Sequence, residues 1–466
     1  MTTQKEDAAF PLARNAVATR YENLSPETVE ITKRSILDTV GVILGATGMS
    51  KPSKTVVDLV KEGGGNPESS IFGFGGKVPS WMAAYANGAM AQALDYDDVY
   101  DEGRNHNSGG TLPAIFAIAE RIGNVSGKEF ITAAALGIDI TARMSISVCE
   151  SKQGFEDDWF LTPLFGAYGS TLGAGKLLGL NVEQMVDALG IVLNQAAGSM
   201  EMSFQPSAQV RELYSAFPGF NGVMSALWAQ RGLTGVRNSL ESRAGLFKMY
   251  FKGHYDRDRL LDRIGERFEG TLTSFKPWPS CRLSQCHVDA AYNLATKHDI
   301  KPENISKIIV HICDSTKTLM EPAQDRRRPK FATHAKRSIP YTISVILARR
   351  KLMIGDFNEA ALKDSSVLRL VDKVDMVYDQ SLFTPGIPPA VVDIITNNGT
   401  KYTWRTEHAY GHPANPLSRE GLIEKFYDCL SYSVKKFNKT ASQKLSKTFM
   451  NLEDVDNISK VIRMLV

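Results

Sequence analysis

The feature that most limits how this chain can fold is a pair of helical segments rich in alanine and glycine. They run from Trp81 to Ala93 and from Phe165 to Leu180. An interior glycine costs a helix about 1 kcal/mol relative to alanine, so a helix that keeps several must gain from close backbone approach. The pattern therefore predicts a tightly packed helical bundle, some of whose helices could cross a subunit interface.

Composition narrows the class of protein. The chain has 466 residues, 43% of them hydrophobic, enough for roughly two to four domains with large cores. Its 54 basic and 51 acidic residues leave a net charge of +3, too small to hold a nucleic-acid backbone. The five cysteines are scattered, unlike a disulfide framework or a zinc knuckle, which fits a reducing compartment. No apolar run has the length of a signal peptide or a membrane span, so we expect a cytoplasmic protein without membrane or nucleic-acid partners.

Two patterns of secondary structure follow one another along the chain. Cap signals such as Ser25-Pro26-Glu27 and Asn181-Val182-Glu183-Gln184 precede helical apolar periods as far as about Phe268. After Lys276-Pro277-Trp278-Pro279 the chain predicts, in order, an amphipathic helix, a β-branched strand and a hairpin: Val288 to His298, Ile305 to Ile312, and Val391 to Trp404 around Asn397-Asn398-Gly399. The second pattern indicates an inserted α+β domain.

The domain boundaries follow from these patterns. We expect a helical domain in residues 1–268, the α+β domain in residues 269–404, and a return to the helical domain in residues 405–466. The fold class is therefore mostly α, with a helical domain built from both chain ends.

One turn-rich connection between small-residue helices concentrates chemically active side chains. It runs from Ala93 through Asp95-Tyr96-Asp97-Asp98 to His106 and Ser108-Gly109-Gly110. Carboxylates and a histidine in such a place need partners or a ligand, which is typical of an active-site loop. The alternative is an exposed acidic turn whose aspartates cap the next helix.

Several segments, in order over nearly the whole chain, together resemble the MmgE/PrpD family, which includes 2-methylcitrate dehydratase, cis-aconitate decarboxylase and iminodisuccinate epimerase. The matching segments are Ile36-Leu37-Asp38-Thr39-Val40-Gly41, Ala93-Leu94-Asp95-Tyr96-Asp97-Asp98, Gly173-Ala174-Gly175-Lys176-Leu177-Leu178-Gly179-Leu180, Arg231-Gly232-Leu233-Thr234-Gly235, Phe275-Lys276-Pro277-Trp278-Pro279-Ser280-Cys281-Arg282, Ser338-Ile339-Pro340-Tyr341 and Asn415-Pro416-Leu417-Ser418. The resemblance implies a homodimer in which the mixed domain forms a lid over the helical domain, with the active site between them. It also implies a reaction on a small di- or tricarboxylate without an organic cofactor or a metal.

The chain also departs from the family pattern at positions that matter for chemistry. Val99 stands where the decarboxylases and dehydratases have a threonine, and Phe160 takes the place of a second family histidine. The lysine and histidine of the next site helix correspond to Arg211 and Tyr214. The lid histidine falls on Gln285, with His287 two residues later. These departures predict a divergent substrate or step.

The candidate catalytic residues are His106, Asp95 and Lys276. An imidazole titrates near neutrality, so His106 suits proton transfer, and Asp95 could fix its tautomer or bind a substrate hydroxyl. His106 could instead only bond the loop backbone. By its place in the resembled family, Lys276 is expected to pair with a substrate carboxylate as the lid closes, whereas a lone lysine is usually solvated.

The candidate substrate-binding residues are Arg211, Tyr214, Arg282 and Ser108. Arg211 offers a planar fork for a carboxylate, and Tyr214 shares its helical face if the segment is helical. An interface ion pair is the alternative for Arg211. The basic run from Arg326 to Lys330 is predicted to be a solvated lid loop that could also steer anions inward.

These expectations lead to a lyase that dehydrates or decarboxylates a small di- or tricarboxylate. Charge develops on a carboxylate in either step, and Lys276, Arg211 and Arg282 would stabilise it. The alternatives are an epimerase, which tolerates the loss of one histidine better, and a non-catalytic carboxylate-binding protein on the same fold.

Overall fold

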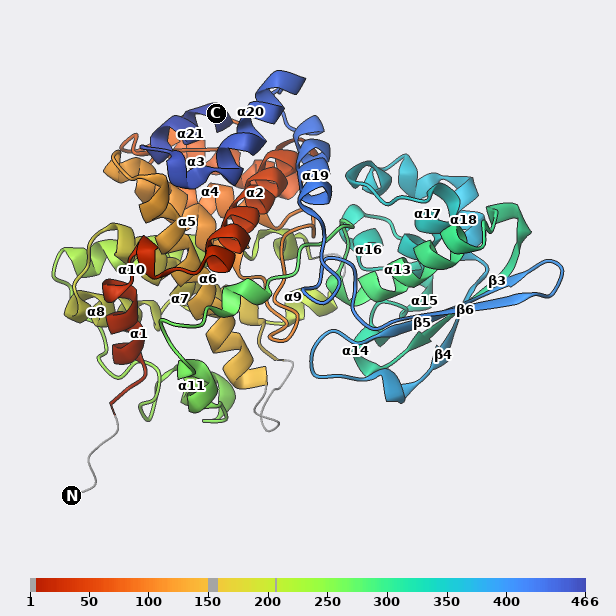
Figure 1. Cartoon of the computed structure of the whole chain (residues 1–466), viewed down its shortest axis with the longest axis horizontal. Helices are drawn as coiled ribbons and strands as arrows, with labels where there is room; N and C mark the ends of the chain where they lie inside the picture. The colour runs from red at the N-terminus through yellow and green to blue at the C-terminus, as the bar shows by residue number, and fades with distance from the viewer. Residues whose placement is uncertain (1–5, 150–157, 206–207) are drawn as a thin grey trace. The chain divides into compact units, whose positions relative to one another are not determined.

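The computed structural model describes residues 6–149, 158–205 and 208–466, and the chain divides into two compact units. The helical unit comprises Met1–Met202, Val210–Thr273 and Leu422–Val466, and the mixed unit comprises Ser203–Gln209 and Ser274–Gly421. The chain is mostly α, as predicted, with a helical unit drawn from both chain ends (Figure 1).

The helical unit is a bundle built around long buried helices. Its helices are α1 Ala9–Ala18, α2 Pro26–Met49, α3 Lys51–Gly63, α4 Ser80–Ala91, α5 Ser108–Ile122, α6 Gly127–Cys149, α7 Leu161–Leu177, α8 Val182–Val192, α10 Ala216–Gln230, α11 Leu246–Phe251, α12 Arg257–Leu261, α20 Lys439–Met450 and α21 Ile458–Leu465. A short ribbon pairs β1 Ser69–Ser70 with β2 Lys77–Val78. Two helices contain a boundary between the units, α9 Glu201–Phe204 and α19 Arg419–Ser431.

The cap signals mark true helix starts. The Ser25 hydroxyl accepts a hydrogen bond from the Thr28 amide at 3.1 Å, at the start of α2. At the start of α8, Asn181 and Gln184 exchange side-chain bonds with each other's amides at 2.9 and 3.2 Å, a complete capping box.

The small-residue helices pack closely inside the helical unit. A Cβ on Gly169 of α7 would lie 2.0 Å from Thr141 Oγ1 of α6, and one on Gly222 of α10 would lie 2.3 Å from Ser170 Cβ of α7. Neither position has room for a side chain, so glycine sets the separation of these helices. The gain from close approach that the sequence predicts is therefore found within one chain.

Helix α6 passes through the middle of this bundle. Among the described residues it is the one helix long and apolar enough to cross a membrane, and its apolar window is wholly buried inside the unit. It therefore occupies the position of a core helix.

The mixed unit combines a four-stranded sheet with helices. Its elements are β3 Ile305–Ile312, β4 Val374–Tyr378, β5 Ala390–Thr396, β6 Lys401–Thr406, α13 Arg282–Lys297, α14 Asp314–Lys317, α15 Ala323–Arg327, α16 Ala332–Lys336, α17 Ile339–Arg349 and α18 Ser365–Val371. The strand order is β4-β3-β5-β6, with β3 and β4 parallel and the other pairs antiparallel. The predicted helix, strand and hairpin are all present.

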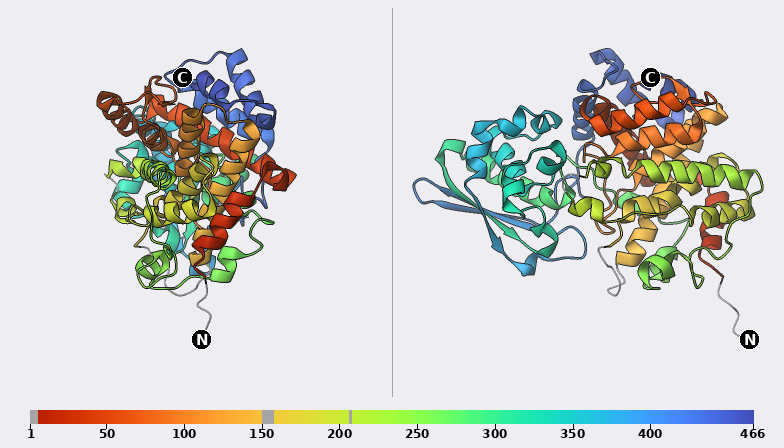
Figure 2. Two further views of the ribbon diagram at one scale, coloured as in Figure 1. Left: turned by 90° about the vertical axis from the view of Figure 1, so that its left-hand side faces the viewer. Right: turned by 180° about the vertical axis from the view of Figure 1, so that it is seen from behind.

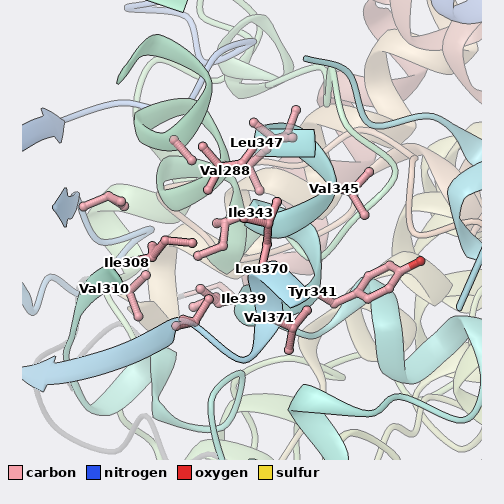
Figure 3. Packing of buried hydrophobic residues seen from close by; sticks show 14 of the residues in the cluster. Val288, Ile308, Val310, Ile339, Tyr341, Ile343, Val345, Leu347, Leu370 and Val371 are labelled. Atoms are coloured by element: carbon pink, nitrogen blue, oxygen red, sulfur yellow. The ribbon is translucent and has the colours of Figure 1, made fainter. Parts of the chain in front are cut away.

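The core of the mixed unit lies between this sheet and its helices, which cover one face (Figure 2). Ile308 and Val310 of β3 pack with Val288 of α13 and with Ile339 and Ile343 of α17 (Figure 3). All five side chains are fully buried. The alternation of β3 thus places its apolar face against α13 and α17.

The unit boundaries differ from the expected ones because of one loop. The division falls at Ser274 and at Gly421, rather than at residues 269 and 404. The Phe275 amide donates to the Gly411 carbonyl at 3.0 Å, and the Tyr410 amide donates to Asp289 at 2.6 Å. A Cβ on Gly411 would lie 1.8 Å from the Phe275 oxygen, so only glycine allows this approach. These bonds keep the segment after β6 in the mixed unit.

The basic run is not a solvated loop throughout, and that expectation was wrong for half of it. Arg326 is buried, and Arg327 donates to the Val371 and Asp372 carbonyls at 3.3 and 3.4 Å. Only Arg328 and Lys330 of the basic side chains are exposed. Arg327 thus binds backbone at the end of α18, and Arg326 donates to the Glu321 carbonyl at 3.3 Å, roles that charge counting does not reveal.

Candidate active site

The loop between α4 and α5 is ordered by its own backbone. Tyr100 and Asn105 exchange two backbone hydrogen bonds, at 2.7 and 3.2 Å, which close the acidic turn between them. The loop is buried rather than exposed, with Asp97, Asp98 and Asn105 fully shielded. The reading as a solvated acidic turn is therefore wrong.

His106 lies at the end of this turn with a defined orientation. Its Nδ1 atom is 2.9 Å from Asp97 Oδ2 and 3.0 Å from the Asp98 carbonyl oxygen. The Asp98 carbonyl accepts a hydrogen bond from Nδ1, and the Asp97 carboxylate lies at ion-pair distance from the same atom. Nδ1 therefore carries the proton and Nε2 is the nitrogen left for chemistry. The His106 amide donates to Thr162 Oγ1 at 3.1 Å, which ties the residue to the start of α7. The His106 side chain is 13% exposed, so it is held firmly but is not sealed off.

Asp98 forms a second buried contact in the loop between α4 and α5. The Ser108 hydroxyl donates to Asp98 Oδ2 at 2.5 Å, at the first turn of α5. Burial raises the pKa of Asp98 to about 7, and the negative charges of Asp38 and Asp97 add to that effect, while Ser108 and His106 oppose it. Asp98 is therefore partly protonated at neutral pH. Ser108, predicted to bind substrate, has its hydroxyl engaged by this carboxyl group.

Asp97 has the position that the sequence analysis assigned to Asp95. Asp95 is buried and has a φ of 52°, a left-handed conformation that is uncommon for residues other than glycine. This conformation turns the chain within one residue, so spacing along the sequence does not say which aspartate points at His106. The sequence pattern predicts only a helix-capping role for Asp97, but α5 has no side-chain cap.

Three of the departures from the family pattern meet beside His106. The Tyr214 ring lies 6.2 Å from the His106 ring and 4.4 Å from the Phe160 ring, edge to face with the latter. The Arg211 guanidinium lies 5.6 Å from the Phe160 ring centroid. Arg211 lies in a short 3₁₀ helix, Gln209–Leu213, which ends one residue before Tyr214. The structure thus places Arg211 and Tyr214 each against the Phe160 ring.

The predicted cations of the mixed unit are buried. Lys276 is fully shielded and Arg282 is 3% exposed. Arg282 donates to Gln285 Oε1 at 2.9 Å and to the Tyr410 carbonyl at 3.1 Å. Gln285 in turn donates to the carbonyls of Trp278 and Ser280 at 2.9 and 3.1 Å. Gln285 therefore braces the turn that precedes α13, and Arg282 has structural bonds in addition to any role in binding.

His287 has a structural environment. It is buried, and its Nε2 atom donates to the His311 carbonyl at 2.9 Å. Burial lowers the pKa of His287 to about 4, so the side chain is neutral at physiological pH. Within the described ranges, no three His, Cys, Asp or Glu side chains gather as a metal-binding group.

Sequence comparisons agree with the fold. A model of the MmgE/PrpD N-terminal domain matches residues 11–258, and a model of the MmgE/PrpD C-terminal domain matches residues 278–450. The chain is 27% identical to cis-aconitate decarboxylase of Aspergillus terreus over 413 residues, 85% of this chain and 83% of that enzyme. It is 25% identical to cis-aconitate decarboxylase of Homo sapiens over 456 residues, 95% of this chain and 91% of that enzyme. Since the two domain models together cover most of the chain, it belongs to the MmgE/PrpD family.

Proposed function

We propose that this chain is a lyase that acts on a small di- or tricarboxylate by proton transfer next to a carboxylate. Family membership and the names of its relatives support a lyase-type function at the level of the family. The observation that carries the proposal is the His106–Asp97 pair, because a carboxylate on Nδ1 leaves Nε2 to give or take a proton.

The proposed step uses that nitrogen in one of two ways. In a decarboxylation, the bond to a carboxylate carbon breaks, carbon dioxide leaves, and the imidazolium gives its Nε2 proton to the remaining carbanion. In a dehydration, Nε2 removes the proton next to the carboxylate, the C–O bond breaks, and the leaving hydroxide takes that proton from Nε2 and departs as water. Charge gathers on the carboxylate in both, and we assign Lys276, Arg211 and Arg282 to binding it. The step requires no organic cofactor or metal.

The alternative is an epimerase, and Phe160 is the observation that favours it. An apolar ring replaces the second family histidine, so this face of the site has one fewer proton carrier. Removal and return of a proton needs no acid for a leaving group.

One assay series separates these functions. A thermal-shift screen with cis-aconitate, 2-methylcitrate and iminodisuccinate identifies ligands, and turnover of each hit is then followed in deuterated water. We expect loss of carbon dioxide or water with His106-dependent turnover. Exchange of the α-hydrogen without an unsaturated product would identify an epimerase, and binding without any turnover would identify a carboxylate-binding protein.

The role of Lys276 has its own test. Lys276→Met should weaken binding or catalysis by about 2 to 4 kcal/mol, the scale for losing a buried charge partner. Lys276→Arg keeps the charge and is the matched control. Equal activity in wild type and Lys276→Met would remove Lys276 from the site.

We further propose that the chain forms a homodimer through α4 and α10. Neither helix contains a charged residue, yet Phe217 and Trp228 are 41% and 39% exposed, and Tyr85 of α4 stacks edge to face on Phe217 at 5.7 Å. A two-fold interface sets each patch against its own copy, so an uncharged face avoids like-charge contacts. Light scattering should show a dimer that Trp228→Glu dissociates, whereas Leu59→Glu on exposed α3 should not.

We also propose that the protein works in a reducing compartment. None of the five cysteines is joined in a disulfide bond in the described residues, which supports a reducing environment such as the cytoplasm.

A further inference from the structure

Lys425 is a buried cation that reaches the site loop from the far end of the chain. It lies on α19, is 5% exposed, and its Nζ atom is 2.5 Å from Asp38 Oδ1 of α2. The same atom donates to the Tyr96 carbonyl at 2.5 Å and lies 4.1 Å from the centroid of the Tyr96 ring. A buried ammonium group with a carboxylate, a carbonyl and a ring face around it has a fixed position.

The Tyr96 carbonyl is part of the peptide group that leads into Asp97. A donor on this oxygen therefore limits rotation of the plane from which the Asp97 side chain projects. The preceding residue, Asp95, has the left-handed φ of 52°, a conformation that persists only where surrounding contacts hold it. Lys425 supplies such a contact on one side of Asp97, and His106 lies on the other.

We infer that Lys425 is a positioning residue of the proposed site: by holding the Tyr96–Asp97 peptide it keeps the Asp97 carboxylate on His106 Nδ1, an inference that rests on the proposed function. Asp38 pairs with the Lys425 ammonium group and holds it in place. The charge of Asp38 also acts on this loop, where it adds to the raised pKa of Asp98. An ion pair that only stabilised the bundle would not require the bond to Tyr96.

The chain offers a matched control for the ion pair. Lys33 also joins α2 to the C-terminal part of the helical unit, with its Nζ atom 2.7 Å from Glu453 Oε1 and a side chain that is 7% exposed. The partners recorded for Lys33 are carboxylates outside the site loop. Lys33→Met therefore removes a comparable ion pair and leaves the bond to Tyr96 intact.

The test reads the tautomer of His106 directly. Nitrogen-15 shifts of the imidazoles distinguish a proton on Nδ1 from one on Nε2, and His106→Asn assigns the signal among the eight histidines. In wild type and in Lys33→Met we expect the proton on Nδ1. In Lys425→Met we expect a shift toward the Nε2-protonated form, as the freed Tyr96–Asp97 peptide moves both the Asp97 carboxylate and the Asp98 carbonyl away from Nδ1. Lys425→Arg, which retains a charged donor, should restore the wild-type signal.

A double variant controls for the possibility that Lys425→Met alone fails to fold. Asp38→Asn combined with Lys425→Met leaves no uncompensated charge in the core, yet still removes the donor to Tyr96. It should show the same change of tautomer. With a turned-over substrate, both variants should lose roughly 10- to 100-fold in kcat with little change in KM, because misplacement of a catalytic pair mainly affects the chemical step.

The outcomes separate this inference from the proposed function. An unchanged tautomer in folded Lys425→Met and in the double variant would overturn the positioning role, whether or not the enzyme turns over. A proton on Nε2 in wild type would also overturn it. A tautomer that depends on Lys425, in a protein that turns over no carboxylate, would support the positioning role and reject the lyase.

Discussion

His106 in the helical unit and His287 in the mixed unit show how two histidines acquire different environments. One ring nitrogen of each is bonded to a backbone carbonyl, that of Asp98 for His106 and that of His311 for His287. Only His106 also has a carboxylate beside that nitrogen, with Asp97 Oδ2 at 2.9 Å. The His106 side chain keeps an exposed edge, whereas His287 is sealed in the core and burial lowers its pKa to about 4. A charged acceptor and a route to solvent suit proton transfer, and a carbonyl in a closed core suits structure.

The largest difference between the two histidines is expected in kcat when each imidazole is replaced. His106→Asn places an amide nitrogen where Nδ1 lies but cannot titrate, so kcat should fall by roughly 10²- to 10⁴-fold with little change in binding. His287→Gln keeps a donor for the His311 carbonyl and should leave kcat within a few-fold of wild type. Steady-state kinetics on both variants checks this. Near-normal turnover by His106→Asn would end the acid/base assignment.

The second-largest effect concerns Asp98, whose buried carboxyl group makes the free energy of unfolding depend on pH. An unfolded aspartate ionises near 3.9, but Asp98 keeps its proton to about pH 7 in the fold. Between about pH 4 and 7 the unfolded state has lost this proton and the folded state has not, so stability falls as pH rises. The loss is on the order of 4 kcal/mol for a shift of this size.

Asp98→Asn is a neutral isostere that still accepts the Ser108 bond. Its free energy of unfolding, measured with urea across this pH range, should lack that fall, and the difference from wild type isolates the group. Parallel curves for wild type and variant would mean that Asp98 is ionised in the fold.

His287 should show a dependence of the opposite sign. Its unfolded side chain binds a proton below about pH 6.5, but the folded side chain resists protonation until about pH 4. Stability is therefore complete above pH 6.5 and falls as the pH falls, by about 3 kcal/mol. His287→Gln should flatten this slope. Slopes of the same sign for Asp98 and His287 would contradict the contrast between the two regions.

Sequence reasoning recovered the elements better than the contacts. Apolar periods and cap residues located α2, α8, α13 and β3, because these signals act over a few residues. The loop with His106 was identified, but the acceptor on its Nδ1 was not, since the left-handed Asp95 redirects the chain. Lys425 contacts Tyr96 across 329 positions of sequence, and no local pattern reports a contact of that kind.

In the mixed unit, too, the sequence does not reveal which atoms a side chain contacts. Gln285 and His287 fall at or near a family histidine position, and only the structure shows that both hold backbone carbonyls around α13. Residue type alone leaves catalytic and structural roles open, and the partner atoms decide between them.

The smallest effect concerns the aromatic residues that distinguish the surroundings of His106. Phe160 and Tyr214 meet edge to face at 4.4 Å, and such pairs contribute about 0.5 to 1.5 kcal/mol beyond their buried area. A double-mutant cycle with Phe160→Leu and Tyr214→Leu, read by urea unfolding, should give a coupling energy of about that size. Because Tyr214 also lies beside His106, Tyr214→Leu should reduce kcat more than Phe160→Leu does. Additive single variants with equal kcat would mean that these rings only fill space, and the difference between His106 and His287 would then rest on Asp97 and exposure alone.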